Sequence, residues 1–569
     1  MRRKWLKGAL WVLLTPIVLF VILMILLYVP PVQNFIRKQA TAIASDATGM
    51  NISVERIDLR FPLNLLVRGV QVVQSEADAA DVQHPDTLLN LGSLNVSVQA
   101  WPLLQGRVEV NDITLQQVAV NSSNLLEGMH IKGTLGRFFL ESHGIDLKKE
   151  DAILNNVELS NTHMQVMLAD TTETPKDSTE TAVNWRIALH NLKLKNVSVD
   201  LQMPLDSMAL GANIGDASIE DANVDLKRQF YGWRRFTLTE SAVNYDSGMA
   251  APVEGFDASH IALRDIRIGI DSVMACGRDM NAIIREFSMY DRSGLTVTSL
   301  TGRLFADSTL IRIPYLQLKT PHSDMDLTAQ TYWKLVDIPT TGHLSARFNA
   351  NIGKQDVLLF AGGLPETFKE AYPFRPLVIH AGTEGNLKQM QISRFTAELP
   401  GAFFLSGGGE LWNLTDSLTR NGGLDFEMQT QDLNFLTGLT GVTPDGSIIV
   451  PDSMNLVARL GLDGPQCNAI LKIKEGEGSL GLDAAYNLNT EVYHADLAID
   501  ALQLHHFLPK DSIYTLTARV TAKGQGVDVA SHKTIARVEA KLDELQYARW
   551  NISGVDLDAG LKSSVASVH

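Results

Sequence analysis

Apolar and polar residues alternate over most of the chain after residue 50, with one repeated irregularity. In residues 187–201 the apolar positions alternate, skip one place and then alternate again, and the same cadence occurs in residues 113–120, 219–226 and 261–270. Alternation is typical of a β-strand with one apolar face. One extra residue moves every later side chain to the other face, unless the strand bulges or the chain turns there.

The skipped places often hold Asn, Asp or Gln, as in His190-Asn191, Lys195-Asn196, Gln116-Gln117 and Arg264-Asp265. A bulge or tight turn at each skip would keep all the apolar residues on one side of a sheet. The sequence therefore predicts a mainly β protein whose sheet has one persistent apolar face. The residues expected on this face, which would line a groove if the face is open, are Ile187, Leu189, Leu192, Leu194, Val197, Val199, Ile261, Leu263, Ile266 and Ile268.

Helical periodicity is limited to a few segments. Apolar residues recur at helical spacing within residues 30–49, which predicts an amphipathic juxtamembrane helix that lies in the headgroups or packs on the first strands. Short helical signals at residues 356–360, 432–436 and 504–508 recur about every 75 residues, each followed by strand-like segments and glycines. We therefore expect the β-region of residues 50–349 to continue through residues 350–569 as a degenerate repeat of one short helix and several strands.

Two further segments differ from this texture. Residues 170–182 are polar and lack periodicity, which predicts a loop excursion from the sheet edge. Near the N-terminus, the basic residues Arg2, Arg3, Lys4 and Lys7 precede an uncharged run from residue 8 to residue 29, which as a helix would cover roughly 30 Å, one hydrocarbon thickness.

The run is open to two interpretations, a cleaved secretory signal and an uncleaved anchor. Signal h-regions have about 7–15 residues, and the nearest A-x-A-like site, at residues 42–44, lies well beyond the run. We therefore expect residues 1–29 to form a cytoplasmic basic tip and a transmembrane anchor, with the remaining chain exported. The apolar residues of the anchor include Leu10, Val12, Leu13, Ile17, Phe20, Ile22 and Leu26.

Charge and cysteine content restrict the possible partners. The formal net charge is −15, and residues 1–38 hold six basic and no acidic residues, so the rest of the chain carries −21. This argues against nucleic acid or an anionic membrane surface as the partner of the exported part, because both require a basic face. Cys276 and Cys467 are the only cysteines and cannot form a disulfide framework.

The sequence offers little that indicates catalysis. Residues 476–481 match G-x-G-x-x-G, but alternation continues after them where a dinucleotide site needs a helix, so a hairpin turn is expected. The adjacent His505 and His506 do not have the spacing of a metal pair, and Cys276 is expected to be a small buried residue. We predict a protein without catalytic residues, cofactor or metal. A periplasmic hydrolase would need carboxylates or histidines that converge only in three dimensions.

The alternation itself is compatible with two structures. In the first, two apolar faces close on each other as an ordinary core. In the second, one face is the floor of an open groove that carries acyl chains, since each buried methylene contributes ~0.8 kcal/mol. Both structures use the same pattern of residues.

Several segments, in the order in which they occur, resemble the start of TamB and AsmA-like proteins of Gram-negative envelopes. They are the anchor, the helix that begins Val32-Gln33-Asn34-Phe35, the first strand in residues 49–60, and residues 66–72. The cadence of residues 187–201 and the recurrent Leu-Pro and Gly units extend the likeness over most of the chain. The resemblance implies an inner-membrane-anchored periplasmic protein with an elongated β-groove, taco-like in section and built from a repeating antiparallel or solenoid sheet. Such a protein carries phospholipid toward the outer membrane or assists outer-membrane protein assembly.

The expected function is therefore that of a bridge-like lipid carrier with its N-terminus in the cytoplasm and its bulk in the periplasm. Phospholipid acyl chains and the inner membrane are the expected partners. The alternative is a translocation and assembly module subunit that acts as a scaffold for outer-membrane protein biogenesis. TamB chains are longer and end in a β-rich segment that meets an outer-membrane β-barrel assembly protein. Such a segment is not apparent here, so we expect a portion of a longer protein or a shorter AsmA-like relative.

Overall fold

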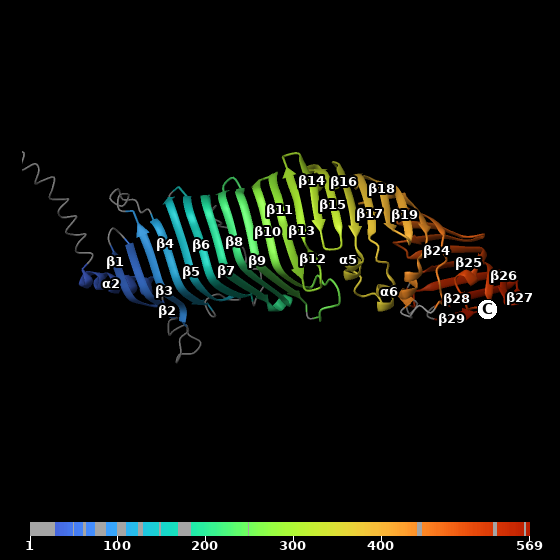
Figure 1. Cartoon of the computed structure of the whole chain (residues 1–569), viewed down its shortest axis with the longest axis horizontal. Coiled ribbons are helices and arrows are strands. Elements are labelled where there is room, and N and C mark those ends of the chain that lie inside the picture. Colours follow the sequence, from blue (N-terminus) through green and yellow to red (C-terminus); the bar gives the residue numbers. More distant parts are fainter. Residues whose placement is uncertain are drawn as a thin grey trace, which may run out of the picture. The chain divides into compact units, whose positions relative to one another are not determined.

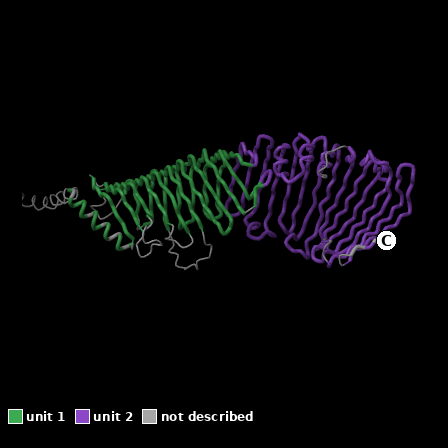
Figure 2. Tube along the Cα trace, turned by 90° about the horizontal axis from the view of Figure 1, so that it is seen from below, with its two compact units in different colours: residues 1–252, 257–292 green, residues 253–256, 293–569 purple. Residues whose placement is uncertain are grey.

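The computed structural model divides the chain into two compact units, shown in Figure 2. Unit 1 comprises residues 1–252 and 257–292, and unit 2 comprises residues 253–256 and 293–569. The residues whose structure is described are 29–48, 50–60, 64–73, 87–99, 110–122, 129–146, 149–168, 184–248, 250–440, 446–526, 528, 532–562 and 565–568.

The N-terminal anchor, expected in residues 1–29, lies outside the described residues except for Val29, and so do its apolar residues Leu10 to Leu26. Within the described ranges, no helix is both long enough and apolar enough to cross a membrane. The expected loop excursion at residues 170–182 also lies outside these ranges.

Unit 1 is a ladder of β-strands that lie side by side (Figure 1). Its elements are α2 (Pro30–Thr48), β1 (Asn51–Arg60), β2 (Asn64–Val73), β3 (Thr87–Val98), β4 (Val110–Asn121), β5 (Met129–Asp146), β6 (Asp151–Leu168), β7 (Arg186–Met203), η1 (Pro204–Asp206), β8 (Met208–Asp225), β9 (Phe230–Ser247), β10 (His260–Cys276) and β11 (Asp279–Asp291). Each strand pairs with the next one in the chain.

The pairing is antiparallel except between β6 and β7, which are parallel with Asp151 opposite Arg186. The mainly β class is thus confirmed, and the antiparallel arrangement predicted for the sheet has this one exception. Skipped residues do not reveal strand direction, because side chains alternate in the same way along parallel and antiparallel strands.

A line of backbone irregularities, which we call the crease, crosses unit 1 from strand to strand. Positive φ angles near 50–60° occur at Gly69, Gln117, Asn161, Asn196 and Glu240, and the residues opposite them fall out of the regular register. Asp265 repeats the feature in β10 (φ 51°). The turns predicted at Gln116-Gln117, Lys195-Asn196 and Arg264-Asp265 are therefore confirmed, each at the second residue of the pair.

Glycine stands opposite Gln117, Asn161 and Glu240 of the crease. A Cβ atom built on Gly215 would lie 2.7 Å from the Cβ of Glu240, and one on Gly136 would lie 2.8 Å from the Cβ of Asn161. These distances are shorter than any normal carbon contact, so the left-handed residue on one strand requires glycine on its neighbour. Gln117, Asn161 and Glu240 thus each require glycine at the opposite position of the neighbouring strand.

Helix α2 lies along the outer edge of β1 and bonds to its backbone. Arg37 Nη1 donates to Val54 O (3.1 Å) and Glu55 O (2.9 Å), and Gln33 Nε2 donates to Leu59 O (3.2 Å). Ser45 Oγ accepts from Ile52 N (3.1 Å). Of the two placements open from the sequence, the structure shows packing on the first strand. An edge strand otherwise exposes unpaired backbone groups, which α2 here satisfies.

Unit 2 contains shorter strands and several short helices. Its elements are β12 (Thr296–Val297), β13 (Ser299–Ala306), β14 (Leu310–Lys319), β15 (Asp324–Tyr332), α4 (Trp333–Asp337), β16 (Leu344–Ile352), α5 (Lys354–Leu359), α6 (Glu366–Ala371), β17 (Leu377–Asn386), β18 (Gln389–Leu399), β19 (Phe403–Trp412), β20 (Asn421–Thr430), η2 (Asn434–Thr440), β21 (Asn455–Asp463), β22 (Gln466–Glu475), β23 (Gly478–Asn487), β24 (Val492–Gln503), η3 (Leu504–His506), β25 (Ile513–Gln525), β26 (Ile535–Tyr547), β27 (Trp550–Ile552), β28 (Val555–Lys562) and β29 (Val565–Val568).

From β13 to β26 each strand pairs antiparallel with the next, and β26 pairs with both β27 and β28. The short helices predicted near residues 356, 432 and 504 are present as α5, η2 and η3. A compact hydrophobic cluster lies where α6 and η2 meet the strand ends. We call it the rim cluster, and its buried members are Phe368, Tyr372, Leu399, Ala402, Leu433 and Phe435.

Candidate functional site

Strand register assembles the alternating apolar residues of unit 1 into rows that run across the strands. One row, the Leu192 row, takes one residue from each strand from β1 to β11 and contains no polar side chain. Its members are Leu59, Leu65, Val96, Ile113, Leu140, Val157, Leu192, Ile219, Phe236, Ile270 and Ile284.

A second row, the Leu194 row, runs beside the first on the same face and is equally apolar. Its members are Ile57, Val67, Leu94, Leu115, Phe138, Leu159, Leu194, Ala217, Leu238, Ile268 and Phe287. Together the rows define what we call the apolar face of unit 1.

Exposure distinguishes an open face from a closed core. Every member of the Leu192 row is half-buried, and in the Leu194 row only Ala217 is fully buried. In a closed sandwich, residues in the middle of central strands pack at the density of an organic crystal and lose nearly all contact with solvent. Among the described residues of unit 1 the helices are α2, at the edge of β1, and η1, after β7. No helical layer therefore lies over the middle strands of this described sheet.

The residues predicted to line the groove lie on two strands of this face. Ile187 to Val199 belong to β7, and Ile261 to Ile268 belong to β10. Register places Leu194 in the same row as Ile268, and Val199 in the same row as Leu263. Val197 and Ile266 are 6% and 4% exposed, Val199 is 37% exposed, and the other predicted residues are half-buried. Their role in contacting lipid stays a prediction.

Unit 2 has an apolar face of the same kind. The Ala458 row crosses β13 to β28, and apart from Gly302 none of its members is fully buried. The members are Gly302, Leu316, Leu327, Phe348, Ala381, Phe395, Gly407, Phe426, Ala458, Leu471, Leu482, Leu497, Val520, Ala540 and Leu557.

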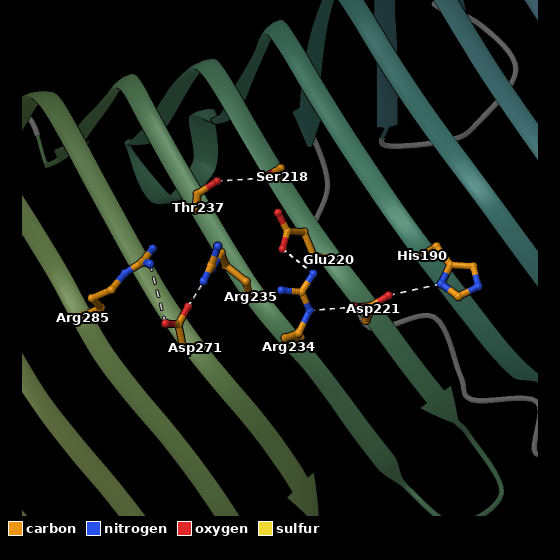
Figure 3. Close-up of polar contacts among 9 residues, drawn as sticks. All are labelled: His190, Ser218, Glu220, Asp221, Arg234, Arg235, Thr237, Asp271 and Arg285. Atoms are coloured by element: carbon orange, nitrogen blue, oxygen red, sulfur yellow. Dashed lines mark hydrogen bonds and ion pairs between the residues drawn. The ribbon is translucent and has the colours of Figure 1, made fainter.

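The opposite face of unit 1 carries polar and charged side chains, some of which form a network across β7 to β11 (Figure 3). Arg234 Nε lies 2.7 Å from Asp221 Oδ2, and Arg234 Nη2 lies 2.8 Å from Glu220 Oε2. His190 Nδ1 lies 3.2 Å from Asp221 Oδ1. The neighbours Glu220 and Asp221 thus reach the same arginine. Consecutive residues of a regular strand point to opposite faces, so the positive φ of Asp221 (50°) turns both to the polar side.

The charges of the network affect one another. The hydrogen bond from Arg234 lowers the pKa of Asp221 below its ordinary value, with a smaller contribution from His190. The same hydrogen bond and the charge of Glu220 raise the pKa of Arg234. Farther along the face, Asp271 accepts from Arg235 Nε (3.2 Å) and lies 3.7 Å from Arg285 Nη1. These side chains are solvent-exposed or half-exposed, so the network is a surface feature.

The candidates for chemistry are dispersed. Within residues 476–481, Gly476 and Glu477 form the predicted hairpin turn between β22 and β23, with Gly476 at φ +57°, and residues 478–481 begin β23. His506 Nδ1 lies 2.6 Å from Glu475 Oε1, and the rings of His505 and His506 are 4.1 Å apart. Cys276 is half-buried instead of buried, because it ends β10 beside the exposed turn that begins β11. Groups of His, Cys, Asp and Glu that could hold a metal ion are absent from the described part of the chain.

Sequence reasoning did not identify the crease glycines or the rim cluster. The signal for the glycines was present, since Gly92, Gly136 and Gly215 lie within alternating segments, but the partner strand that requires them is known only from the register. No protein-family model matches the chain, and no curated protein matches it.

Proposed function

We propose that the apolar faces of the two units bind the acyl chains of phospholipid, and that the protein carries phospholipid from the inner membrane through the periplasm toward the outer membrane. The observation that supports this proposal is the combination of uninterrupted apolar rows with half-buried side chains. An apolar surface of this extent left uncovered on a sheet is typical of a binding surface.

The energetics favour chains over headgroups. A chain methylene removed from water contributes ~0.8 kcal/mol wherever along the row it lies. The Leu192 row has a member on every strand from β1 to β11, and at a strand spacing of about 4.8 Å it extends for roughly 48 Å without a polar side chain. A chain would therefore meet neither a barrier nor a strongly preferred position along the row.

The crease gives the face a suitable curvature. At the crease two consecutive residues of a strand point to the polar side, so the polar side of the sheet is the longer one. A bulged strand bends, and strands with the extra residue on the polar side bend toward the apolar side. The apolar face then becomes the inner surface of a trough in which a chain contacts more of the sheet than it would on a flat surface.

Site-specific photo-crosslinking tests the proposal. A photo-reactive amino acid replaces Leu192, Leu194 or Ile268 on the apolar face, and the matched control replaces Lys193, which lies between the first two on the same strand and points to the polar face. After irradiation in cells, mass spectrometry should find phospholipid adducts at the three apolar positions and none at Lys193. A folded protein without lipid adducts contradicts the proposal, and adducts with polypeptide at these positions favour the scaffold function instead.

A further inference from the structure

We propose that unit 2 contains a defined binding site for one straight, unbranched alkyl chain of about 16–18 carbons, held across strands β19 to β24. The site deepens the proposed function and rests on it for the way in which the chain reaches unit 2.

A run of alanines creates the floor of this site. Register places Leu460, Ala469, Ala484, Ala495, Ala522 and Val538 in one row across β21 to β26. Four consecutive strands thus contribute a single methyl group, whereas Leu460 and Val538 at the two ends are larger. Because all six lie on the apolar face, the alanines leave a depression, of which Ala469, Ala484 and Ala495 line the cavity.

Larger side chains bound the alanine floor on both sides. Two residues farther along the same strands, one neighbouring row contains Leu471, Leu482, Leu497 and Val520. The other neighbouring row contains Leu462, Cys467, Tyr486 and Tyr493. Residues two apart on a strand are separated by about 6.8 Å, so the two flanking rows are roughly 14 Å apart from backbone to backbone. After their side chains fill part of this width, the remaining space fits one chain.

The structure contains a cavity at this place with a volume of about 520 Å³. Its lining comes from β19 to β24 and includes Leu411, Leu460, Cys467, Ala469, Ala484 and Ala495. The volume lies within the ~300–1,000 Å³ of small-molecule sites. The lining is mainly apolar, and its polar side chains are those of Asn468, His494, Tyr486 and Tyr493. The chemistry of the lining therefore fits a hydrocarbon segment, with any polar head outside the cavity.

The length of the cavity sets the length of the chain. Six strands are separated by five spacings of about 4.8 Å, which gives roughly 24 Å. A fully extended alkyl chain advances roughly 1.3 Å per carbon, from a C–C bond of about 1.5 Å, so about 18 carbons span the site. Methyl branches widen a chain and would meet the leucine and tyrosine walls.

Gly524 extends the tyrosine wall over the next strand. A Cβ atom at Gly524 would lie 2.7 Å from Cζ of Tyr493, so only glycine leaves room for this ring. The ring lies toward β25 beside Ala495, where it narrows the site. In unit 1 the Leu192 and Leu194 rows contain one alanine, Ala217, and no run of alanines.

The native Cys467 reports on the occupancy of the site because it belongs to the lining and is half-buried. In the full-length Cys276→Ser protein, the rate of Cys467 modification by a thiol reagent is measured with and without palmitate below its micelle concentration. At palmitate ten times its Kd, labelling should be ~tenfold slower. The tetramethyl-branched phytanic acid, which has the same main-chain length, should slow labelling by less than twofold. Equal protection by the two acids, or none by palmitate, overturns the proposal.

A pair of substitutions on one strand provides the matched control. Ala495→Leu fills the cavity and should abolish protection by palmitate, whereas Ala498→Leu places the same side chain on the polar face of β24 and should preserve it. Protection that persists in a folded Ala495→Leu protein overturns the site. If Leu192 crosslinks to phospholipid while Cys467 stays unprotected, the proposed function stands and the site falls. If palmitate protects Cys467 but Leu192 forms no lipid adducts, the alkyl-chain site in unit 2 stands and the proposed lipid-carrying function is contradicted.

Discussion

Strands β5 to β9 of unit 1 have 18 residues each and cross the crease, whereas strands β19 to β23 of unit 2 have 9 or 10 residues and pair without a break in register. Both sets present an apolar face that is mostly half-buried. The rim cluster of fully buried side chains belongs to unit 2, at the ends of its strands. Each unit therefore stabilises an open face by different means.

In unit 1 the stabilising interactions lie within the sheet. In its described residues, cross-strand contacts along the rows, backbone hydrogen bonds and the fit between left-handed residues and glycines maintain the middle strands, over which no second layer is described. Unit 2 adds a small conventional core that is separate from its apolar face. The comparison teaches that an apolar face can stay uncovered when the residues that specify the fold lie elsewhere, in the crease in one case and in the rim cluster in the other.

The largest effect on stability is expected in the rim cluster. Leu399 is 1% exposed and packs in the rim cluster, whose members include Phe435 and Ala402. Leu399→Ala should lower the free energy of unfolding of unit 2 by about 2–5 kcal/mol, because it removes buried methyl groups and leaves a cavity. Hydrogen exchange measured by mass spectrometry on peptides from β18 and β19 checks this value. Unit 1 peptides serve as the internal control, and an equal loss of protection in both units would contradict separate sources of stability.

The crease should respond next most strongly. A valine at position 215 would bring its Cβ to 2.7 Å from the Cβ of Glu240, so β8 and β9 would have to move apart. Gly215→Val should destabilise unit 1 by about 1–3 kcal/mol, as overpacking does in a core. Gly481→Val in β23 is the matched control, since a Cβ there meets no atom within 4 Å. Hydrogen exchange in β8 and β9 should increase only in the first variant, and similar behaviour of both would remove the crease as a specific constraint.

A leucine of the apolar face should cost less than a leucine of the rim cluster. Leu192 is half-buried, so Leu192→Ala loses only part of the transfer free energy of its side chain and leaves no enclosed cavity. We expect a destabilisation of about 1 kcal/mol, from the area coefficient for apolar surface. Hydrogen exchange in β7 measures the destabilisation caused by Leu192→Ala, and the Leu399→Ala variant is measured in parallel for comparison. A cost equal to that of Leu399→Ala would mean that another layer covers the face.

The sequence was sufficient to predict the alternating strands, three short helices and the skips at Asn196, Gln117 and Asp265, because each depends on neighbours in the chain. The same cadence could not show that Asn161 belongs to the crease, since the residues around it, Ser160 and Thr162, are polar and interrupt the apolar pattern. Nor could it show the parallel pairing of β6 with β7, because in a parallel pair the chain must return from the end of β6 to the side of the sheet where β6 began.

The candidate site was likewise predictable only as far as it depends on neighbours in the chain. Alternation places Leu192, Leu194 and Ile268 on apolar positions, but whether a layer covers them is a tertiary property that exposure alone reveals. The alanine floor was not visible in the sequence, because Ala469, Ala484 and Ala495 each look ordinary within their own strands. They form a row only because the antiparallel register pairs Ala469 with Ala484 and Ala484 with Ala495, and that register is set by the hairpins that connect the strands.

The smallest effect is expected from the polar face of unit 1. The folded pKa of Asp221 lies below its ordinary value, chiefly because of the Arg234 hydrogen bond, so the stability it contributes is present above the unfolded pKa near 3.8 and is lost as the pH falls through the folded value. Arg234→Gln removes the main cause, and unit 1 of this variant should lose less stability between pH 4 and pH 2 than the original protein. Because both side chains are exposed, the difference should shrink in ~1 M salt. Hydrogen exchange in β8 and β9, measured as a function of pH, tests this prediction. The control is Arg459→Gln, which breaks the exposed ion pair between Arg459 and Asp425 in unit 2. An unchanged acid dependence in Arg234→Gln would mean that the network contributes nothing to the stability of unit 1.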